Sequence, residues 1–202
     1  IIDRNLYERS CDVRWWATDA AAVDAVAKPS AESAAHASQR LGVILNAYTV
    51  YLDLWIADAS GRVVANGRPQ KYGKVIGSNV AHTSWFKAAM ATHSGDDYAA
   101  FDVERAPLLD NAQVATYTTA IRESGAADGK PLGALGIFFD WQPQAQAIVQ
   151  GSQLSAEERG FTRCLLLDSR HRIIAASDSN GVLAETFPLN VRDKTGYFAD
   201  AG

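Results

Sequence analysis

The chain has 202 residues, of which 48% are hydrophobic and 21% charged, a composition that is typical of folded globular proteins and excludes a disordered chain. The formal net charge of −4 and the pI of about 5.5 argue against a nucleic-acid-binding protein, because such proteins need a basic surface. No stretch predicts a transmembrane helix, since Asn46 and Asp53 interrupt the most apolar window, and no signal peptide is recognisable.

The first part of the chain is predicted to be helical. Residues 3–27 contain no Gly or Pro, carry apolar residues at helical spacing, and are followed by Pro29, which ends the segment. A second helix is expected from Ser30, which has the residue type of an N-cap, to Tyr48. We therefore expect residues 1–46 to form a long helical stalk.

From Tyr51 to Asp140 the pattern changes to β-strands with one inserted helix. The order is two strands, the helix, then three more strands, which is the order of a PAS-like antiparallel α+β module. We expect this module to occupy residues 47–150. The predicted strands cover residues 51–58, 62–67, 97–104, 113–122 and 132–141, and the helix covers residues 83–93.

A hairpin pattern occurs twice. "YLDLWIADASGRVVANG" at 51–67 aligns with "CLLLDSRHRIIAASDSNG" at 164–181 when Asp58 is matched with Asp168. Coincidence is the alternative, because an Asp followed by a turn is common. The repeat favours a second, smaller PAS-like module at 151–202, in which both aspartates are structural and accept hydrogen bonds from the turn amides.

This organisation resembles the double Cache (dCache) family, the extracytoplasmic sensor domains of bacterial chemoreceptors and other transmembrane signal transducers. The resemblance covers nearly the whole chain. It implies an α+β fold in which a long N-terminal helix carries two PAS-like antiparallel modules. It also implies that the module at 47–150 is membrane-distal and binds the ligand, and that the module at 151–202 is membrane-proximal and incomplete.

The family's pocket residues can be carried over by position. Trp85 and Phe86 match the aromatic pair of the amino-acid-binding branch, with Phe in place of Tyr, and Thr83 stands where that branch has an Arg for the ligand carboxylate. A Thr hydroxyl cannot replace that bidentate grip, so an α-amino acid held in the usual way is not expected. The ligand-binding residues that the resemblance implies are Thr83, Trp85, Phe86, Tyr98, Asp102, Tyr117 and Asp140.

An aromatic pocket with acidic groups suits an ammonium group through charge and cation–π contact. A small carboxylate would instead need a cation, and Lys74, Lys87 and Arg122 are the candidates that we considered. Each pocket residue also has a structural alternative: Trp85 fits a helix core, and Asp140 fits a turn at the end of a strand.

We expect the small-molecule sensor of a periplasmic, membrane-anchored transducer, with a methyl-accepting chemotaxis receptor as first choice. A histidine kinase or diguanylate cyclase sensor and a ligand-free dimerisation module are the alternatives. Expected partners are a small organic ligand, flanking transmembrane helices, a cytoplasmic signalling module and, as an option, a second copy paired through the N-terminal helix; nucleic acid is not expected. No metal, cofactor or enzyme motif is present among the histidines or elsewhere. We interpret Cys11 and Cys164 as two buried thiols, with a disulfide as the alternative.

Overall fold

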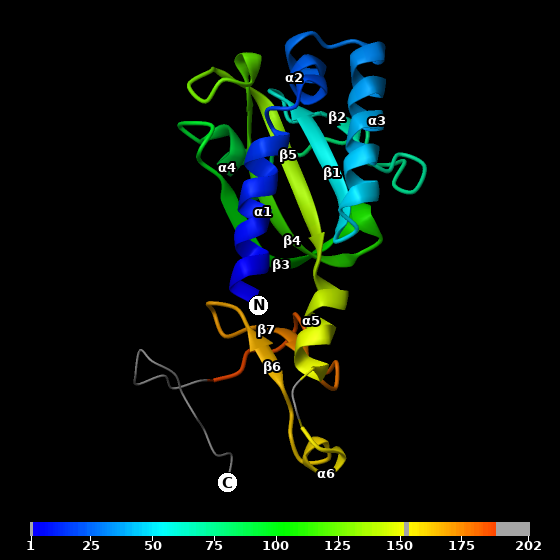
Figure 1. The fold of residues 1–202 in the computed structure, drawn as a ribbon, viewed down its shortest axis with the longest axis vertical. Helices are drawn as coiled ribbons and strands as arrows, with labels where there is room; N and C mark the ends of the chain where they lie inside the picture. The colour runs from blue at the N-terminus through cyan, green and yellow to red at the C-terminus, as the bar shows by residue number, and fades with distance from the viewer. Residues whose placement is uncertain (1, 152–153, 189–202) are drawn as a thin grey trace. The chain divides into compact units, whose positions relative to one another are not determined.

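The computed structural model describes residues 2–151 and 154–188, and for residues 2–6 the backbone alone (Figure 1). The chain divides into two compact units, residues 1–141 and 142–202, which we call unit 1 and unit 2. Residues 189–202, part of the predicted second module, lie outside the described residues.

Unit 1 begins with the helices α1 (Ile2–Trp16), α2 (Ala20–Ala27) and α3 (Ala31–Ala47). The expectation of one continuous helix over residues 3–27 is wrong. The helix breaks at residues 17–19 because the Asp19 side chain accepts the amide hydrogen of Ala21 at 3.0 Å and starts a new helix as its N-cap. Ser30 caps α3 as predicted, in a reciprocal capping box with Ser33.

The five strands of unit 1 form one antiparallel sheet in the order β2-β1-β5-β4-β3, which confirms the predicted α+β, PAS-like arrangement. One helix, α4, lies between the second and third strands in chain order. The 3-10 helices η1 (Pro107–Leu109) and η2 (Glu123–Gly125) connect the later strands. The elements are β1 (Tyr51–Asp58), β2 (Val63–Asn66), α4 (Ser84–Met90), β3 (Ala99–Ala106), β4 (Ala112–Arg122) and β5 (Pro131–Asp140).

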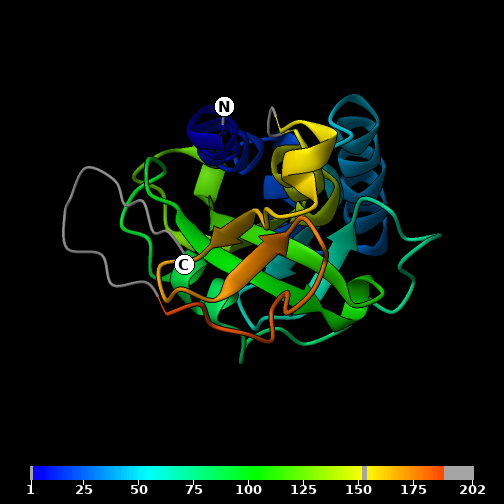
Figure 2. The same cartoon turned by 90° about the horizontal axis from the view of Figure 1, so that it is seen from below.

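The helices α1, α2 and α3 cover one face of the sheet, and α4 covers the other (Figures 1 and 2). Successive strand residues alternate between the two faces. On β5, for example, Phe139 packs against Tyr51 on the face of α1, and Phe138 packs against Trp85 of α4 on the opposite face. Covering both faces explains why β1 and β5 are almost entirely buried runs of apolar residues.

A buried polar contact fixes α1 to the sheet. Tyr51 donates a hydrogen bond to the carboxylate of Asp12, whose Oδ2 also lies 3.2 Å from Nε of the buried Arg9. The Arg9 guanidinium lies over the rings of Tyr51 and Phe139, at 5.2 and 5.7 Å from their centroids. Burial, followed by the bond to Asp12, raises the pKa of Tyr51 far above its usual range, so the phenol stays a donor.

Unit 2 contains the larger part of α5 (Trp141–Gln150), then α6 (Ala156–Arg159) and an antiparallel pair of strands, β6 (Leu165–Leu167) and β7 (Ile173–Ala176). Its hairpin repeats the geometry of the first one. Asp58 Oδ1 accepts the amides of Ser60 and Arg62 at 2.8 and 3.1 Å, and Asp168 Oδ1 accepts those of Arg170 and Arg172 at 2.8 and 3.0 Å.

The match between the hairpins continues beyond the turn. Gly61 and His171 occupy the same turn position with positive φ angles of 80° and 61°. Isolated bridges then join Arg62 to Asn79 in the first copy and Arg172 to Thr186 in the second. The sequence repeat is therefore a structural repeat, and the two aspartates have the turn-capping role that was predicted. Cys11 and Cys164 are each only partly buried, so the expectation of two buried thiols is wrong, and no disulfide joins them.

Candidate functional site

The sheet face beneath α4 carries an aromatic cluster. The ring centroids of Trp55 and Phe138 lie 4.1 Å apart, and Trp85 of α4 meets Phe138 edge-on at 5.9 Å. Gly136 lies under Trp85, where an added Cβ would come within 3.1 Å of the Trp85 ring. A larger residue at position 136 would push α4 off the sheet, so this glycine permits the close packing.

A cavity of about 480 Å³ opens beside this cluster, between α4, the loop before it, and strands β3, β4 and β5. We call it the α4 cavity. Its inner wall is apolar and its other residues are polar or charged, which is the usual make-up of a small-molecule site. The apolar wall includes Trp55, Trp85, Phe101, Leu108, Val114 and Phe138, and the polar groups include Asn79, His82, Thr83, Asp102, Glu104 and Arg105.

A strand irregularity brings the charged residues together. The pairing of β3 with β4 shifts between Phe101 and Glu104, so strict alternation is lost on the edge strand β3. As a result Asp102, Glu104 and Arg105 all contribute to the cavity, and all three are exposed to solvent. The β3 side therefore offers carboxylates to a cation and a guanidinium to an anion.

Asp53 links the cavity wall to the loop that precedes α4. Its Oδ2 accepts the indole N–H of Trp55 at 3.0 Å and the side-chain amide of Asn66 at 2.7 Å. Its Oδ1 accepts the backbone amides of Gly67 and Arg68 at 3.0 and 3.1 Å. Asp53 is fully buried, and this burial raises its pKa against the opposing effect of the hydrogen bonds.

Three of the predicted site residues meet in the α4 cavity: Thr83, Trp85 and Asp102. Thr83 has a structural task there, because it is the N-cap of α4. Its hydroxyl donates to the Val80 carbonyl at 2.7 Å and accepts the Phe86 amide hydrogen at 3.4 Å. Thr83, which stands where the resemblance implied an Arg, therefore donates its one hydroxyl hydrogen to the backbone of its own chain.

The other predicted residues lie outside the lining of this cavity. Phe86 is buried and packs edge-on against Trp85 at 6.1 Å. Tyr98 is 46% exposed, with the Arg14 guanidinium 5.7 Å from its ring centroid. Tyr117 lies on the side of Arg9 and α1, and burial raises its pKa to about 12.

Asp140 lies beside the cavity without lining it. It pairs in register with Val114, a lining residue, and alternation puts it on the same sheet face as Phe138. Burial raises the pKa of Asp140, and the positive charges of Lys71 and Arg68 oppose that rise. The positive charges that act on Asp140 therefore come from the loop that starts at residue 67.

The sequence reasoning missed several cavity residues. In the sequence, Trp55 and Phe138 have the pattern of ordinary core residues in apolar strands. Only their place on the sheet face that α4 covers distinguishes them from the rest of the core. Arg105 was also missed, although Lys74, Lys87 and Arg122 were considered; none of those three lines the α4 cavity. The signal that could have identified Arg105 is its position in β3, three residues after Asp102.

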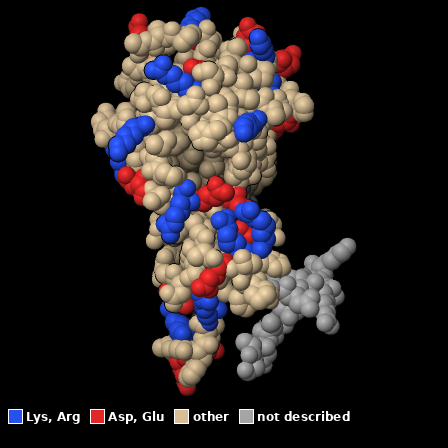
Figure 3. Space-filling model, turned by 180° about the vertical axis from the view of Figure 1, so that it is seen from behind, with Lys and Arg blue, Asp and Glu red and all other residues tan. Residues whose placement is uncertain are grey.

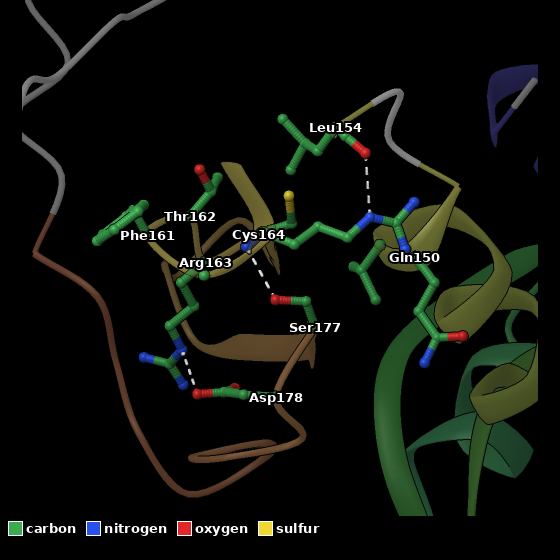
Figure 4. A pocket seen from close by; sticks show the side chains of 11 residues that line it. Gln150, Leu154, Phe161, Thr162, Arg163, Cys164, Ser177 and Asp178 are labelled. Atoms are coloured by element: carbon green, nitrogen blue, oxygen red, sulfur yellow. Dashed lines mark hydrogen bonds and ion pairs between the residues drawn. The ribbon is translucent and has the colours of Figure 1, made fainter. Parts of the chain in front are cut away.

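A second cavity, of about 680 Å³, lies within unit 2 (Figure 4). The polar groups that line it are largely paired with each other. Arg163 Nε lies 3.0 Å from Asp178 Oδ2, and the Cys164 amide donates to Ser177 Oγ at 3.1 Å. Arg159 donates to the Leu154 carbonyl at 3.1 Å. Its one aromatic lining residue, Phe161, is 90% exposed and forms no floor, and we do not assign a ligand to this cavity.

The unit 1 face shown in Figure 3 is largely uncharged, and the few charged side chains are scattered over it.

Within the described part of the chain, no helix has both the length and the apolar composition of a membrane span. The same residues contain no cluster of His, Cys, Asp or Glu that could hold a metal ion.

No protein-family model matches the chain, and comparison with curated proteins gives no match. Solved structures do match. The sensor domain of the Vibrio cholerae histidine kinase DctB superposes with a TM-score of 0.72 at 15% identity, over 90% of this chain and 63% of that one. The chain therefore spans less than two thirds of that sensor domain.

Chemoreceptor domains match as well. The ligand-binding domain of the Pseudomonas fluorescens chemoreceptor CtaA, in complex with L-serine, gives a TM-score of 0.61 at 15% identity over 90% of this chain and 68% of that one. The domain of the Pseudomonas aeruginosa amino-acid chemoreceptor PctC, in complex with GABA, gives 0.62 at 16% identity over 88% and 70%. The fold is thus that of Cache-type sensor domains, and the matched chains are a sensor domain and ligand-binding domains.

Proposed function

We propose that the chain is the small-molecule sensing part of a bacterial transmembrane signal transducer, and that its ligand binds in the α4 cavity of unit 1. The observation that carries this proposal is an aromatic-walled cavity of about 480 Å³ beside α4 in a sensor-type fold. Thr83, Trp85 and Asp102 would contact the ligand, together with Trp55 and Arg105. Asp140, at the end of β5 beside the cavity, would contribute its negative charge to the site.

The cavity chemistry favours a small ligand that carries an amine. Asp102 and Glu104 can accept hydrogen bonds from an ammonium group, and the indole faces add cation–π attraction. Arg105 supplies the cation that a carboxylate on the same molecule would need. CtaA with L-serine and PctC with GABA are neighbours whose ligands combine these two groups. A purely dicarboxylic ligand would have to approach two acidic side chains, so we rank it second.

Signalling would follow from a shift between two arrangements of unit 1. A ligand held by Trp85 on α4 and by Asp102 on β3 would stabilise the closed arrangement of these elements over the sheet. The sensing part would lie in the periplasm, with membrane helices and the signalling module elsewhere in the protein. A chemoreceptor is our first choice of output, with a histidine kinase or diguanylate cyclase second.

The test is a thermal-shift screen over amines, amino acids, small carboxylates and purines, followed by calorimetric titration of the best hit. A ligand at 100 times its Kd stabilises the folded chain by about 2.7 kcal/mol, which such a screen detects. Saturable binding with one site per chain supports the proposal. If no compound class raises the melting temperature, the alternative of a ligand-free dimerisation module is favoured.

A further inference from the structure

Arg122, the last residue of β4, is a buried cation that has no ionic partner among the described residues. It is only 4% exposed. Its guanidinium donates to the carbonyls of Gly129 at 2.8 Å and Thr92 at 2.6 Å, and to the Thr92 hydroxyl at 3.0 Å. These acceptors are neutral, and Nε is buried without any hydrogen-bond partner. Among the described residues, no carboxylate lies within 4.0 Å of it.

A buried charge of this kind is costly, and proteins normally pair it. Asp97 is the acid whose pKa responds to Arg122, but it is engaged elsewhere. Its Oδ2 accepts the backbone amides of His93 and Ser94 at 2.8 and 3.0 Å. These two bonds are the main reason that the pKa of Asp97 is lowered, and the charge of Arg122 contributes least among the causes. Asp97 therefore does not serve as the counter-ion of Arg122.

Arg122 lines a cavity of about 320 Å³ that has no residue in common with the α4 cavity. A second guanidinium, that of Arg14 on α1, lines the same cavity, together with Thr18 and one acid, Asp96. Arg14 is held in place by a 2.9 Å bond from Nε to the Ser10 carbonyl. The charged residues that line the cavity are thus two cations and one anion.

The walls of this cavity are held by tight backbone packing. The Gly95 amide donates to the Ala127 carbonyl at 2.8 Å, and a Cβ on Gly95 would come within 2.9 Å of the Ala127 Cα. Gly125, with a φ angle of +65°, packs against the backbone of Thr18 in the same way. The two loops and the end of α1 therefore form a preformed cradle around the two arginines.

We propose that this cradle binds a small oxyanion, a carboxylate or an inorganic phosphate, between Arg122 and Arg14. Guanidinium groups bind both kinds of oxyanion through paired N–H donors, and the side chains of Arg122 and Arg14 both line this cavity. The bound anion would neutralise Arg122 and would join α1 to the end of the sheet. The proposal does not depend on the ligand of the α4 cavity.

The test is calorimetric titration of the full chain with sodium phosphate and, separately, sodium acetate, with ionic strength held constant by sodium chloride. We expect saturable binding of at least one of the two anions, one per chain. Binding should weaken at least tenfold in Arg14→Gln and in Arg122→Met. Arg40→Gln, which removes a surface guanidinium paired with Asp19, is the matched control and should bind like the wild type.

Circular dichroism shows which variants fold, and if Arg122→Met does not fold, Arg14→Gln decides. Absence of saturable binding to the wild type overturns the proposal, as does binding that Arg14→Gln leaves unchanged. A Trp85→Phe variant separates the two cavities. Loss of anion binding in that variant would move the site to the α4 cavity and would also overturn the proposal.

Discussion

Trp55 and Asp53, two residues apart on β1, are joined by a 3.0 Å hydrogen bond from the indole N–H to the buried carboxylate. The same carboxylate holds Asn66 and the amides that begin the loop before α4. Asp53→Asn keeps the shape but turns one acceptor into a donor. We expect a loss of about 1–3 kcal/mol in unfolding free energy, since buried donors lose their partner.

The Asp53→Asn variant should also bind the α4-cavity ligand more weakly, because Trp55 loses its orientation. The double variant Asp53→Asn with Asn66→Asp restores one donor–acceptor pair and should recover part of the stability. Urea unfolding followed by tryptophan fluorescence measures the stability of the single and the double variant. If the single variant is as stable as the wild type, Asp53 does not have the anchoring role described above.

Thr83 gives a second prediction, because its hydroxyl caps α4 at the edge of the cavity. Thr83→Ala should lower the unfolding free energy by about 1 kcal/mol, the typical value of an N-cap. Thr83→Ser keeps the hydroxyl and is the matched control. Equal urea midpoints for the alanine and serine variants would show that the cap contributes nothing.

The turn of the first hairpin should not tolerate a side chain at Gly61. This residue has a φ angle of +80°, and an added Cβ would lie 2.6 Å from the Ala81 backbone nitrogen. Gly77 has nearly the same φ angle, +84°, with open space around it. Gly77→Ala should therefore cost about 1 kcal/mol from backbone strain alone, and Gly61→Ala should cost clearly more. Similar losses of stability in thermal unfolding of the two variants would contradict this.

Acid should weaken the second hairpin through Asp168. Burial alone would raise the pKa of Asp168, but hydrogen bonds from the backbone and side chain of Arg172 and from the Arg170 amide outweigh it and hold the pKa below its ordinary value of 3.8. A lowered pKa means that the ionised carboxylate stabilises the fold above about pH 3.8, and that this contribution is lost as the pH falls through the folded-state pKa.

Amide hydrogen exchange of the β6 and β7 residues measures this effect in the full chain. Protection should decrease as the pH falls below 3.8 in the wild type, after correction for the intrinsic exchange rate. Asp168→Asn should show lower protection at neutral pH and no such dependence. A wild type and variant with the same pH profile would refute the role of the carboxylate.

Much of the fold could be predicted because local patterns determine it. The strands alternate, and the turn at Asp58 carries its own acceptor. The break before Asp19 was missed because helix-forming residues stand on both sides, Arg, Glu and Leu before it and Ala after it, and no Gly or Pro marks the end. The site was harder. Thr116 faces the cavity, whereas Tyr117 faces α1. Which of two neighbouring strand residues faces the cavity depends on which helices cover each face of the sheet, and this is a tertiary property.

The claim that the α4 cavity is the ligand site is tested most directly by calorimetric titration of the best screening hit against wild type, Asp102→Asn and Asp178→Asn. Asp102 lines the α4 cavity, and Asp178 lines the cavity of unit 2. For an amine ligand we predict at least tenfold weaker binding in Asp102→Asn, because loss of a charged hydrogen bond costs about 1.5–3 kcal/mol, and wild-type affinity in Asp178→Asn. Wild-type affinity in Asp102→Asn together with weakened binding in Asp178→Asn would contradict the assignment.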